Sequence, residues 1–133
     1  AGKDVTIVSF NKMMKVALGA ATELEKEGID AEIINIHTIK PLDVEAVLAS
    51  VAKTRCVVSA EEHNRLGGLG DSIAQVLMQH DPVPMEYVAV DDSFGESGKP
   101  EDLMKKYGLT AGNIVEKVKK VLHRKQAMAR TNV

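Results

Sequence analysis

The residues that could do chemistry are concentrated in one segment, 61–71, which holds two glutamates, a histidine and three glycines. Glu61 and Glu62 come directly before His63, an arrangement that could raise the pKa of the histidine or let it hydrogen-bond a partner. A ligand contact and a surface histidine without a binding role are equally good interpretations of His63. The two glutamates would point to opposite faces of a continuing strand, so they make a poor general acid/base pair.

The elements around this segment predict a strand-to-helix turn. Residues 55–60 are mostly apolar and β-compatible, whereas residues 71–78 repeat apolar side chains at helical spacing. At such a turn the carboxyl end of a strand meets the positive end of a helix dipole, and glycines let backbone amides approach a ligand or another chain. We therefore expect the turn to be a surface feature of a sheet edge.

Other patterns that could bind phosphate or metal are incomplete. Residues 68–73 begin like a dinucleotide-binding fingerprint, but Ile73 stands where the third glycine should be, which favours a simple turn at the start of a helix. Residues 95–100 resemble a phosphate loop superficially, yet only two residues separate the glycines, and Pro100 replaces the magnesium-binding hydroxyl residue. The histidines lack metal-ligand spacing with one another and with the single cysteine: His37, His63, His80, His123 and Cys56. We predict no catalytic, cofactor-binding or metal-binding residue on this chain.

Composition narrows the class of protein. The 133 residues carry 17 basic and 19 acidic side chains for a net charge of -2, which gives no reason to expect nucleic acid or anionic membrane as a partner. Aromatic residues at 3% argue against base-stacking surfaces. The one cysteine, Cys56, lies in an apolar run, and no signal peptide or membrane span is recognisable. We expect one domain in the cytoplasm.

The fold class follows from alternating strand and helix patterns. Strands are predicted at 5–10, 31–36, 55–60 and 85–90, with helices at 12–27, 43–53 and 71–78 between them. Asn11 is expected to cap the first helix, Gly28 to end it, and Met14, Ala17, Leu18, Ala21 and Leu24 to form its apolar stripe. This order indicates an α/β, three-layer domain in which helices flank both faces of a mostly parallel sheet of four or five strands.

The pattern changes after the fourth strand. Residues 91–99 form a long polar loop, which is typical of a functional or docked segment. A short helix from Pro100 is expected to end at Gly108, and Thr110 to cap a last helix up to Leu122. We therefore divide the chain into a domain at 1–122 and a basic polar tail at 123–133, which is expected to be disordered or to dock on a neighbour.

Four segments together resemble the C-terminal domain of transketolases. They are Ile36–Asp43, Ser59–His63 with Gly67–Gly70, Ser97–Leu103 and Tyr107–Thr110. Their order and spacing match as well, and the resemblance covers Val5 to about Leu122. The Ser-Gly-Lys-Pro run and the Tyr-Gly-Leu helix end are more similar to transketolases than to pyruvate dehydrogenase beta subunits or deoxyxylulose phosphate synthases.

The resemblance implies a function that needs more than this chain. Transketolases transfer two-carbon ketol units between sugar phosphates with thiamine diphosphate and a divalent metal. In that family the first domain binds the diphosphate and the middle domain supplies the activating glutamate. The resemblance thus implies a domain that supports domain and homodimer assembly of the complete enzyme, binds no cofactor itself and is inactive alone. Its implied partners are the other transketolase domains or a second subunit.

The surface expected to make these contacts combines the glycine turn with the later polar loop, because both follow the carboxyl ends of parallel strands. The candidate interface or anion contacts are Glu62, His63, Gly67, Gly68, Gly70, Ser97 and Lys99. The alternatives are a free-standing anion- or nucleotide-binding regulatory module that uses the same turn, and the equivalent domain of a deoxyxylulose phosphate synthase or pyruvate dehydrogenase beta subunit.

Overall fold

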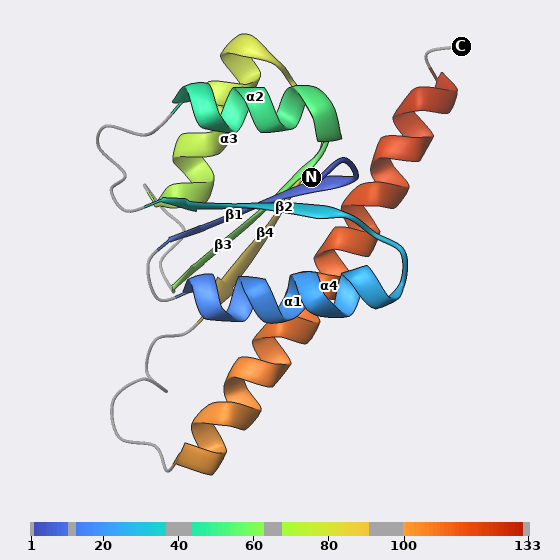
Figure 1. The fold of residues 1–133 in the computed structure, drawn as a ribbon. Coiled ribbons are helices and arrows are strands. Elements are labelled where there is room, and N and C mark those ends of the chain that lie inside the picture. Colours follow the sequence, from blue (N-terminus) through green and yellow to red (C-terminus); the bar gives the residue numbers. More distant parts are fainter. Residues whose placement is uncertain (1, 11–12, 37–43, 63–67, 91–99, 132–133) are drawn as a thin grey trace.

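Four parallel strands form the sheet at the centre of the protein. The computed structural model describes residues 2–10, 13–36, 44–62, 68–90 and 100–131 (Figure 1). The strands β1 (Val5–Phe10), β2 (Ala31–Ile36), β3 (Val57–Glu62) and β4 (Met85–Val90) pair in the order β2-β1-β3-β4. Every pair is parallel. Three strands have the predicted bounds, whereas β3 lies two residues later than predicted.

Helices cover both faces of this sheet. The helices α1 (Met14–Lys26) and α4 (Pro100–Thr131) pack on one face, and α2 (Val44–Thr54) and α3 (Leu69–His80) pack on the other (Figure 1). The predicted three-layer α/β fold is therefore confirmed. None of the described helices combines the length and apolarity that a membrane crossing requires.

The alternation of side chains along β1 explains why both faces are filled. Val5 and Ile7 are fully buried against α1 and α4, whereas Val8 is fully buried on the α2 and α3 side. Val57 of β3 belongs to that second core and is also 0% exposed. Apolar residues on both faces are typical of a parallel sheet that helices cover on both sides.

The end of α1 follows the sequence prediction, whereas its start and its apolar stripe differ. Gly28 has a φ of 78°. Its N–H donates to Glu25 O at 3.0 Å, and Ile29 N–H donates to Leu24 O at 2.9 Å, the two bonds of a Schellman cap. The residue before the helix is Met13 rather than Asn11, which lies outside the described residues. Leu18 is 50% exposed, because Val16, Ala17, Ala20 and Leu24 face the sheet instead.

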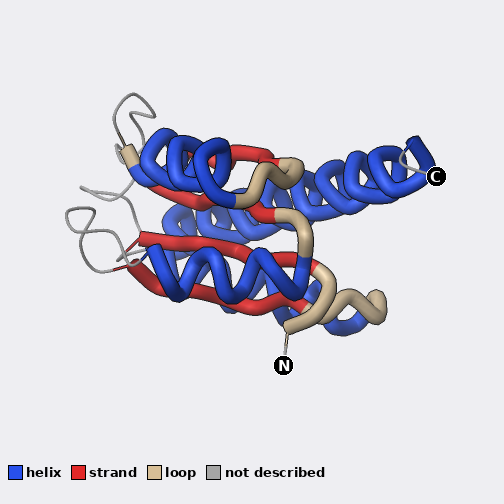
Figure 2. Tube along the Cα trace, turned by 90° about the horizontal axis from the view of Figure 1, so that it is seen from above, coloured by secondary structure: helices blue, strands red, loops and turns tan. Residues whose placement is uncertain are grey.

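One helix stands where two helices and a tail were expected. α4 runs without a break from Pro100 to Thr131, so the predicted end at Gly108 and the predicted cap at Thr110 are wrong. Ile114, Val118 and Val121 are fully buried, and this burial outweighs the cost of about 1 kcal/mol for a glycine inside a helix. Residues 123–131, expected as a separate tail, continue the helix, which extends past the strands in Figure 2.

Candidate functional site

A cluster of polar residues lies where α3 begins, at the carboxyl ends of β3 and β4. We call Ser59, Glu61, Gly70, Asp71 and Tyr87 the carboxyl-edge cluster. Ser59 is paired in register with Tyr87 across the two strands. Ser59 and Glu61 share the face of β3 that carries Val57, so both point toward α2 and α3. The parallel pairing thus brings residues from three separate parts of the sequence to one place.

Gly70 lets α3 approach β4 closely. A Cβ atom on Gly70 would lie 2.5 Å from two ring carbons of Tyr87 and 3.0 Å from Ser59 Oγ. These distances are shorter than ordinary van der Waals contacts, so any side chain would force the helix or the ring to move. Gly70 is buried. Its role in the described structure is therefore helix packing, and its predicted role as an interface or anion contact stays a prediction.

The electrostatics of the cluster are those of a partly desolvated acidic site. Burial raises the pKa of Tyr87, and the carboxylates of Asp71 and Glu61 raise it further. Glu61 is only 5% exposed, although the sequence pattern places a glutamate after the strand. Ser59 Oγ is buried and has no hydrogen-bond partner among the residues that the structure describes. The environment of Tyr87 therefore favours its protonated form.

The predicted site residues fall partly outside the described residues. His63, Gly67, Ser97 and Lys99 lie in the ranges 63–67 and 91–99, of which nothing is described. Glu62 ends β3 and is paired in register with Val90, the last residue of β4. The described parts of β3 and β4 therefore end side by side, and whether the turn and the polar loop meet stays a prediction.

Gly68 has an extended backbone in front of α3. Its φ of -88° and ψ of -162° are open to most residues, and the helix start has no side-chain cap. Gly68 is half-buried, in contrast to the buried Gly70. The sequence pattern does not distinguish these two glycines, and it does not single out Ser59 or Tyr87 as site residues. Tyr87 could have been found from its place opposite Ser59 in adjacent parallel strands.

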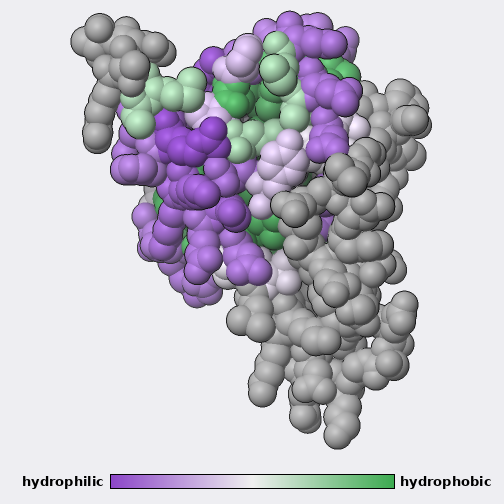
Figure 3. Space-filling view, turned by 180° about the vertical axis from the view of Figure 1, so that it is seen from behind, coloured by the Kyte–Doolittle hydropathy of each residue, from purple (hydrophilic) through white to green (hydrophobic). Residues whose placement is uncertain are grey.

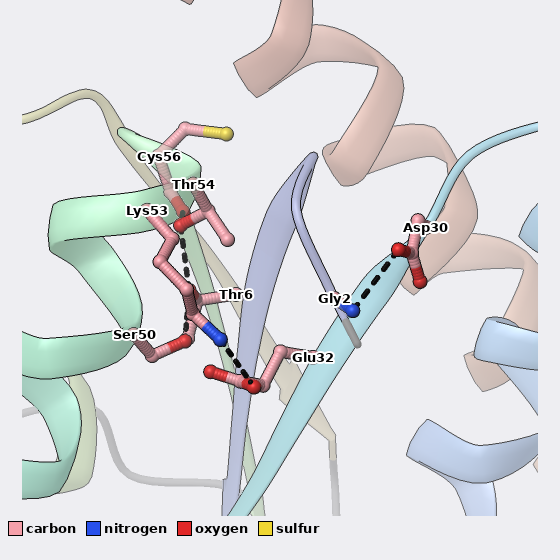
Figure 4. Close-up of polar contacts among 8 residues, drawn as sticks. All are labelled: Gly2, Thr6, Asp30, Glu32, Ser50, Lys53, Thr54 and Cys56. Carbon is pink, nitrogen blue, oxygen red and sulfur yellow. Dashed lines mark hydrogen bonds and ion pairs between the residues drawn. The ribbon is translucent and has the colours of Figure 1, made fainter.

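The opposite end of the sheet has a saturated hydrogen-bond network (Figure 4). We call Thr6, Ser50, Thr54, Cys56 and Lys125 the amino-edge network. Thr6 Oγ1 lies 2.7 Å from both Ser50 Oγ and Thr54 Oγ1, and Thr54 Oγ1 donates to the carbonyl of Cys56 at 3.1 Å. Because the three hydroxyl groups are buried and hydrogen-bonded, they stabilise the fold rather than offer a reactive group.

Three more hydrogen bonds close this amino edge. Lys125 Nζ, from the last turns of α4, donates to the carbonyls of Asp4 at 3.0 Å and Thr54 at 2.8 Å. The Cys56 thiol donates to Asp4 O at 3.3 Å, and its burial raises its pKa to about 11. A neutral, buried thiol is a poor nucleophile. Cys56 is therefore part of the core.

An ion pair lies on the surface beside this network. Lys53 Nζ is 2.8 Å from Glu32 Oε2, and the hydrogen bonds from Lys53 and Ser50 lower the pKa of Glu32 (Figure 4). Gly2 N–H donates to Asp30 Oδ2 at 3.0 Å, and this pair lies on the other side of β1 from Ser50 and Thr54 (Figure 4). In the parts of the chain that the structure describes, no three His, Cys, Asp or Glu side chains are grouped as a metal site requires.

Comparisons with known proteins agree on one family. The family model described as "Transketolase, C-terminal domain" matches residues 1–114. The chain is 48% identical over 124 residues to the 6-deoxy-6-sulfo-D-fructose transketolase subunit SqwH of Clostridium sp. (strain MSTE9), covering 93% of this chain and 38% of that protein. It is 37% identical over 114 residues to a 1-deoxy-D-xylulose-5-phosphate synthase of Heliobacterium modesticaldum, covering 85% of this chain and 18% of the relative.

A solved structure supports the same assignment. The chain superimposes on a protein described as "Split gene transketolase, inactive beta4 tetramer" with a TM-score of 0.81 and 47% sequence identity. The match covers 94% of this chain and 41% of that protein. The chain thus spans less than half the length of these relatives.

Proposed function

Since the chain belongs to the transketolase C-terminal domain family, we propose that it is the C-terminal part of an enzyme that transfers two-carbon ketol units between sugar phosphates. The observation that carries this proposal is the 48% identity, over 93% of the chain, to a protein named as a transketolase subunit. The chemistry belongs to other parts of the enzyme, and this domain supports their assembly. We further propose that the enzyme is cytoplasmic.

Transketolases depend on thiamine diphosphate, and we propose that other domains of this enzyme bind it together with a divalent metal. The family match supports this division of labour, because the matching model describes only the C-terminal domain of transketolases. The part of this chain in the enzyme is proposed to be positioning and support of those domains. The isolated chain is proposed to be inactive.

The carboxyl edge is our proposed assembly face. Gly68 is half-buried with an open backbone in front of α3, and Glu62 and Val90 end neighbouring strands there. Because Gly68 carries no side chain, another chain could approach its backbone closely. The complete enzyme is proposed to be a homodimer, and the similar solved structure, which is described as a tetramer, supports self-assembly in the family.

The test is to reconstitute the enzyme. We would mix the full chain with the separately produced remaining domains and measure ketol transfer, with each part alone as the control. Activity is expected only in the mixture, and calorimetry should show no micromolar thiamine diphosphate binding by the chain alone. Micromolar binding by the chain, or activity of the other domains without it, would contradict the proposal.

A second measurement tests the alternative that the chain is a free-standing regulatory module. Thermal shifts of the full chain with sugar phosphates and nucleotides would reveal an anion site at the His63–Gly70 turn. We expect no shift, because we propose that this domain supports assembly and binds no cofactor or anion itself. A shift that the Gly68→Trp variant loses, without any effect on association, would favour the regulatory module.

A further inference from the structure

One flank of α4 carries a row of basic side chains. Lys117, Lys120 and Arg124 are spaced three and four residues apart, so they lie on one side of the helix. The buried side, with Ile114, Val118 and Val121, is turned by roughly 90° from this row at 100° per residue. The opposite flank carries Val115 and Leu122, which pack against the core that includes α1, and Lys119, whose Nζ lies 2.8 Å from Glu27 Oε1 at the end of α1. The basic row therefore lies on the side of α4 that faces away from α1.

These three cations share a single carboxylate in the ion pairs of the described residues. Arg124 Nη1 is 2.6 Å from Glu86 Oε2, while Lys117 and Lys120 lie 3.7 Å and 3.6 Å from Glu86 Oε1. The two lysine distances are longer than a hydrogen bond, so both ammonium groups keep donors for another acceptor. With one carboxylate for three cations, two positive charges are left in a protein whose net charge is -2.

The row also borders the lateral edge of the sheet, which is the outer side of its last strand. Glu86 belongs to β4, the last strand in the order β2-β1-β3-β4, and β3 is the one strand that pairs with it in the described chain. Arg124 Nη1 also donates to Met85 O at 2.8 Å, which fixes this part of α4 beside the start of β4. Figure 3 shows hydrophilic side chains gathered over the described part of α4 on this side of the molecule.

A strand edge with no neighbouring strand in the described chain, beside three cations that share one carboxylate, fits one class of partner. An extended peptide can add to a sheet edge through backbone hydrogen bonds, and alternate side chains then point to one face. Carboxylates on the α4 side of such a segment would meet Lys117, Lys120 and Arg124. We propose that the β4 edge and this basic row form a docking surface for an extended acidic segment of another protein chain.

The proposal competes with a simpler explanation, since lysines beside an edge strand also discourage unwanted strand pairing. The two can be distinguished with a six-residue peptide that alternates Glu and Thr, added to the isotope-labelled full chain. Its matched control alternates Gln and Thr. Docking predicts that the glutamate peptide slows hydrogen exchange of the β4 amides and shifts the signals of Lys117 and Lys120, and that the glutamine peptide does neither.

Charge variants test the residues themselves. Lys117→Gln combined with Lys120→Gln should weaken glutamate-peptide binding by about tenfold, since each exposed cation contributes up to about fivefold. Lys15→Gln combined with Lys26→Gln removes the same charge from α1 and should leave binding unchanged. Equal weakening by both double variants, equal binding of both peptides, or no binding of the glutamate peptide would overturn the proposal. Inorganic phosphate that reproduces the signal shifts, while the peptide gives no protection of β4, would overturn it in favour of a simple anion patch.

Discussion

The two ends of the sheet differ in how their polar groups are used. At the amino edge, Thr6, Ser50 and Thr54 satisfy one another at 2.7 Å, and Lys125 closes the edge with bonds to two carbonyls. At the carboxyl edge, Ser59 Oγ is buried without a hydrogen-bond partner among the described residues, and Tyr87 has a raised pKa beside two carboxylates. The contrast indicates that the hydrogen bonds of the amino edge stabilise the domain. The carboxyl edge lacks such a network among the described residues, and we propose that it meets another chain.

The largest expected effect comes from the core that joins the two ends. Val57→Asp should unfold the domain, because it buries an unpaired carboxylate at a position that is 0% exposed. The cost of several kcal/mol rivals the whole stability of a domain of this size. Circular dichroism and thermal melts would measure it, with the exposed Ala49→Asp as the control. A cooperative melt of Val57→Asp at the wild-type midpoint would disprove the burial of this strand.

A smaller effect is expected from the close approach at the carboxyl edge. Gly70→Ala should destabilise the domain by about 1–3 kcal/mol, because the new Cβ collides with Tyr87. Gly112→Ala, on α4 with open space around its Cβ, should instead stabilise it by about 0.5–1 kcal/mol. Chemical denaturation of both variants gives the comparison. Similar effects of the two alanines would mean that α3 does not pack on β4 as described.

The hydroxyl groups of the two edges can be compared directly. Thr6→Val removes a hydroxyl that bonds two buried partners and should cost about 1–3 kcal/mol. Ser59→Ala removes a hydroxyl without a described partner and should be close to neutral or stabilising. Urea denaturation would measure the change in unfolding free energy of both variants, provided that this free energy depends equally on urea concentration in each. A larger loss for Ser59→Ala than for Thr6→Val would reverse the assignment of the two edges.

The smallest effect at neutral pH concerns Cys56, whose folded pKa is raised to about 11 from an ordinary value of 9.0. A raised pKa means that the fold favours the protonated thiol, so this contribution is complete below pH 9 and is lost as the pH rises toward 11. The free energy of unfolding should fall over that range by up to about 3 kcal/mol. The Cys56→Ala variant should lack this component. An identical pH dependence in both proteins would show that the thiol titrates normally.

The strands could be predicted from the sequence because short apolar runs between turn signals define them. β1, β2 and β4 have the predicted bounds. β3 starts two residues late because Arg55 adopts a φ of 62° and its N–H bonds Val51 O, which ends α2 there. Glu61 is polar and yet lies in the strand, and only the pairing with β4 explains this.

The C-terminal helix and the sites were harder to predict because tertiary contacts decide them. Gly108 predicts a helix end locally, whereas the packing of α4 on the sheet continues the helix through it. Residues 123–131 lack an apolar period, but Arg124 and Lys125 bond carbonyls of distant segments. The carboxyl-edge cluster joins residues from β3, α3 and β4, so no local spacing reveals it.

The central claim, that the carboxyl edge is the assembly face, is tested most directly by sedimentation of a Gly68→Trp chain mixed with the remaining domains of the enzyme. Gly68 lies in front of α3 at this edge, whereas Gly112 lies on α4 with open space around it, so Gly112→Trp is the matched control. The account predicts that Gly68→Trp melts near the wild-type temperature but loses association, while Gly112→Trp associates normally. Association of Gly68→Trp at the wild-type level would contradict it.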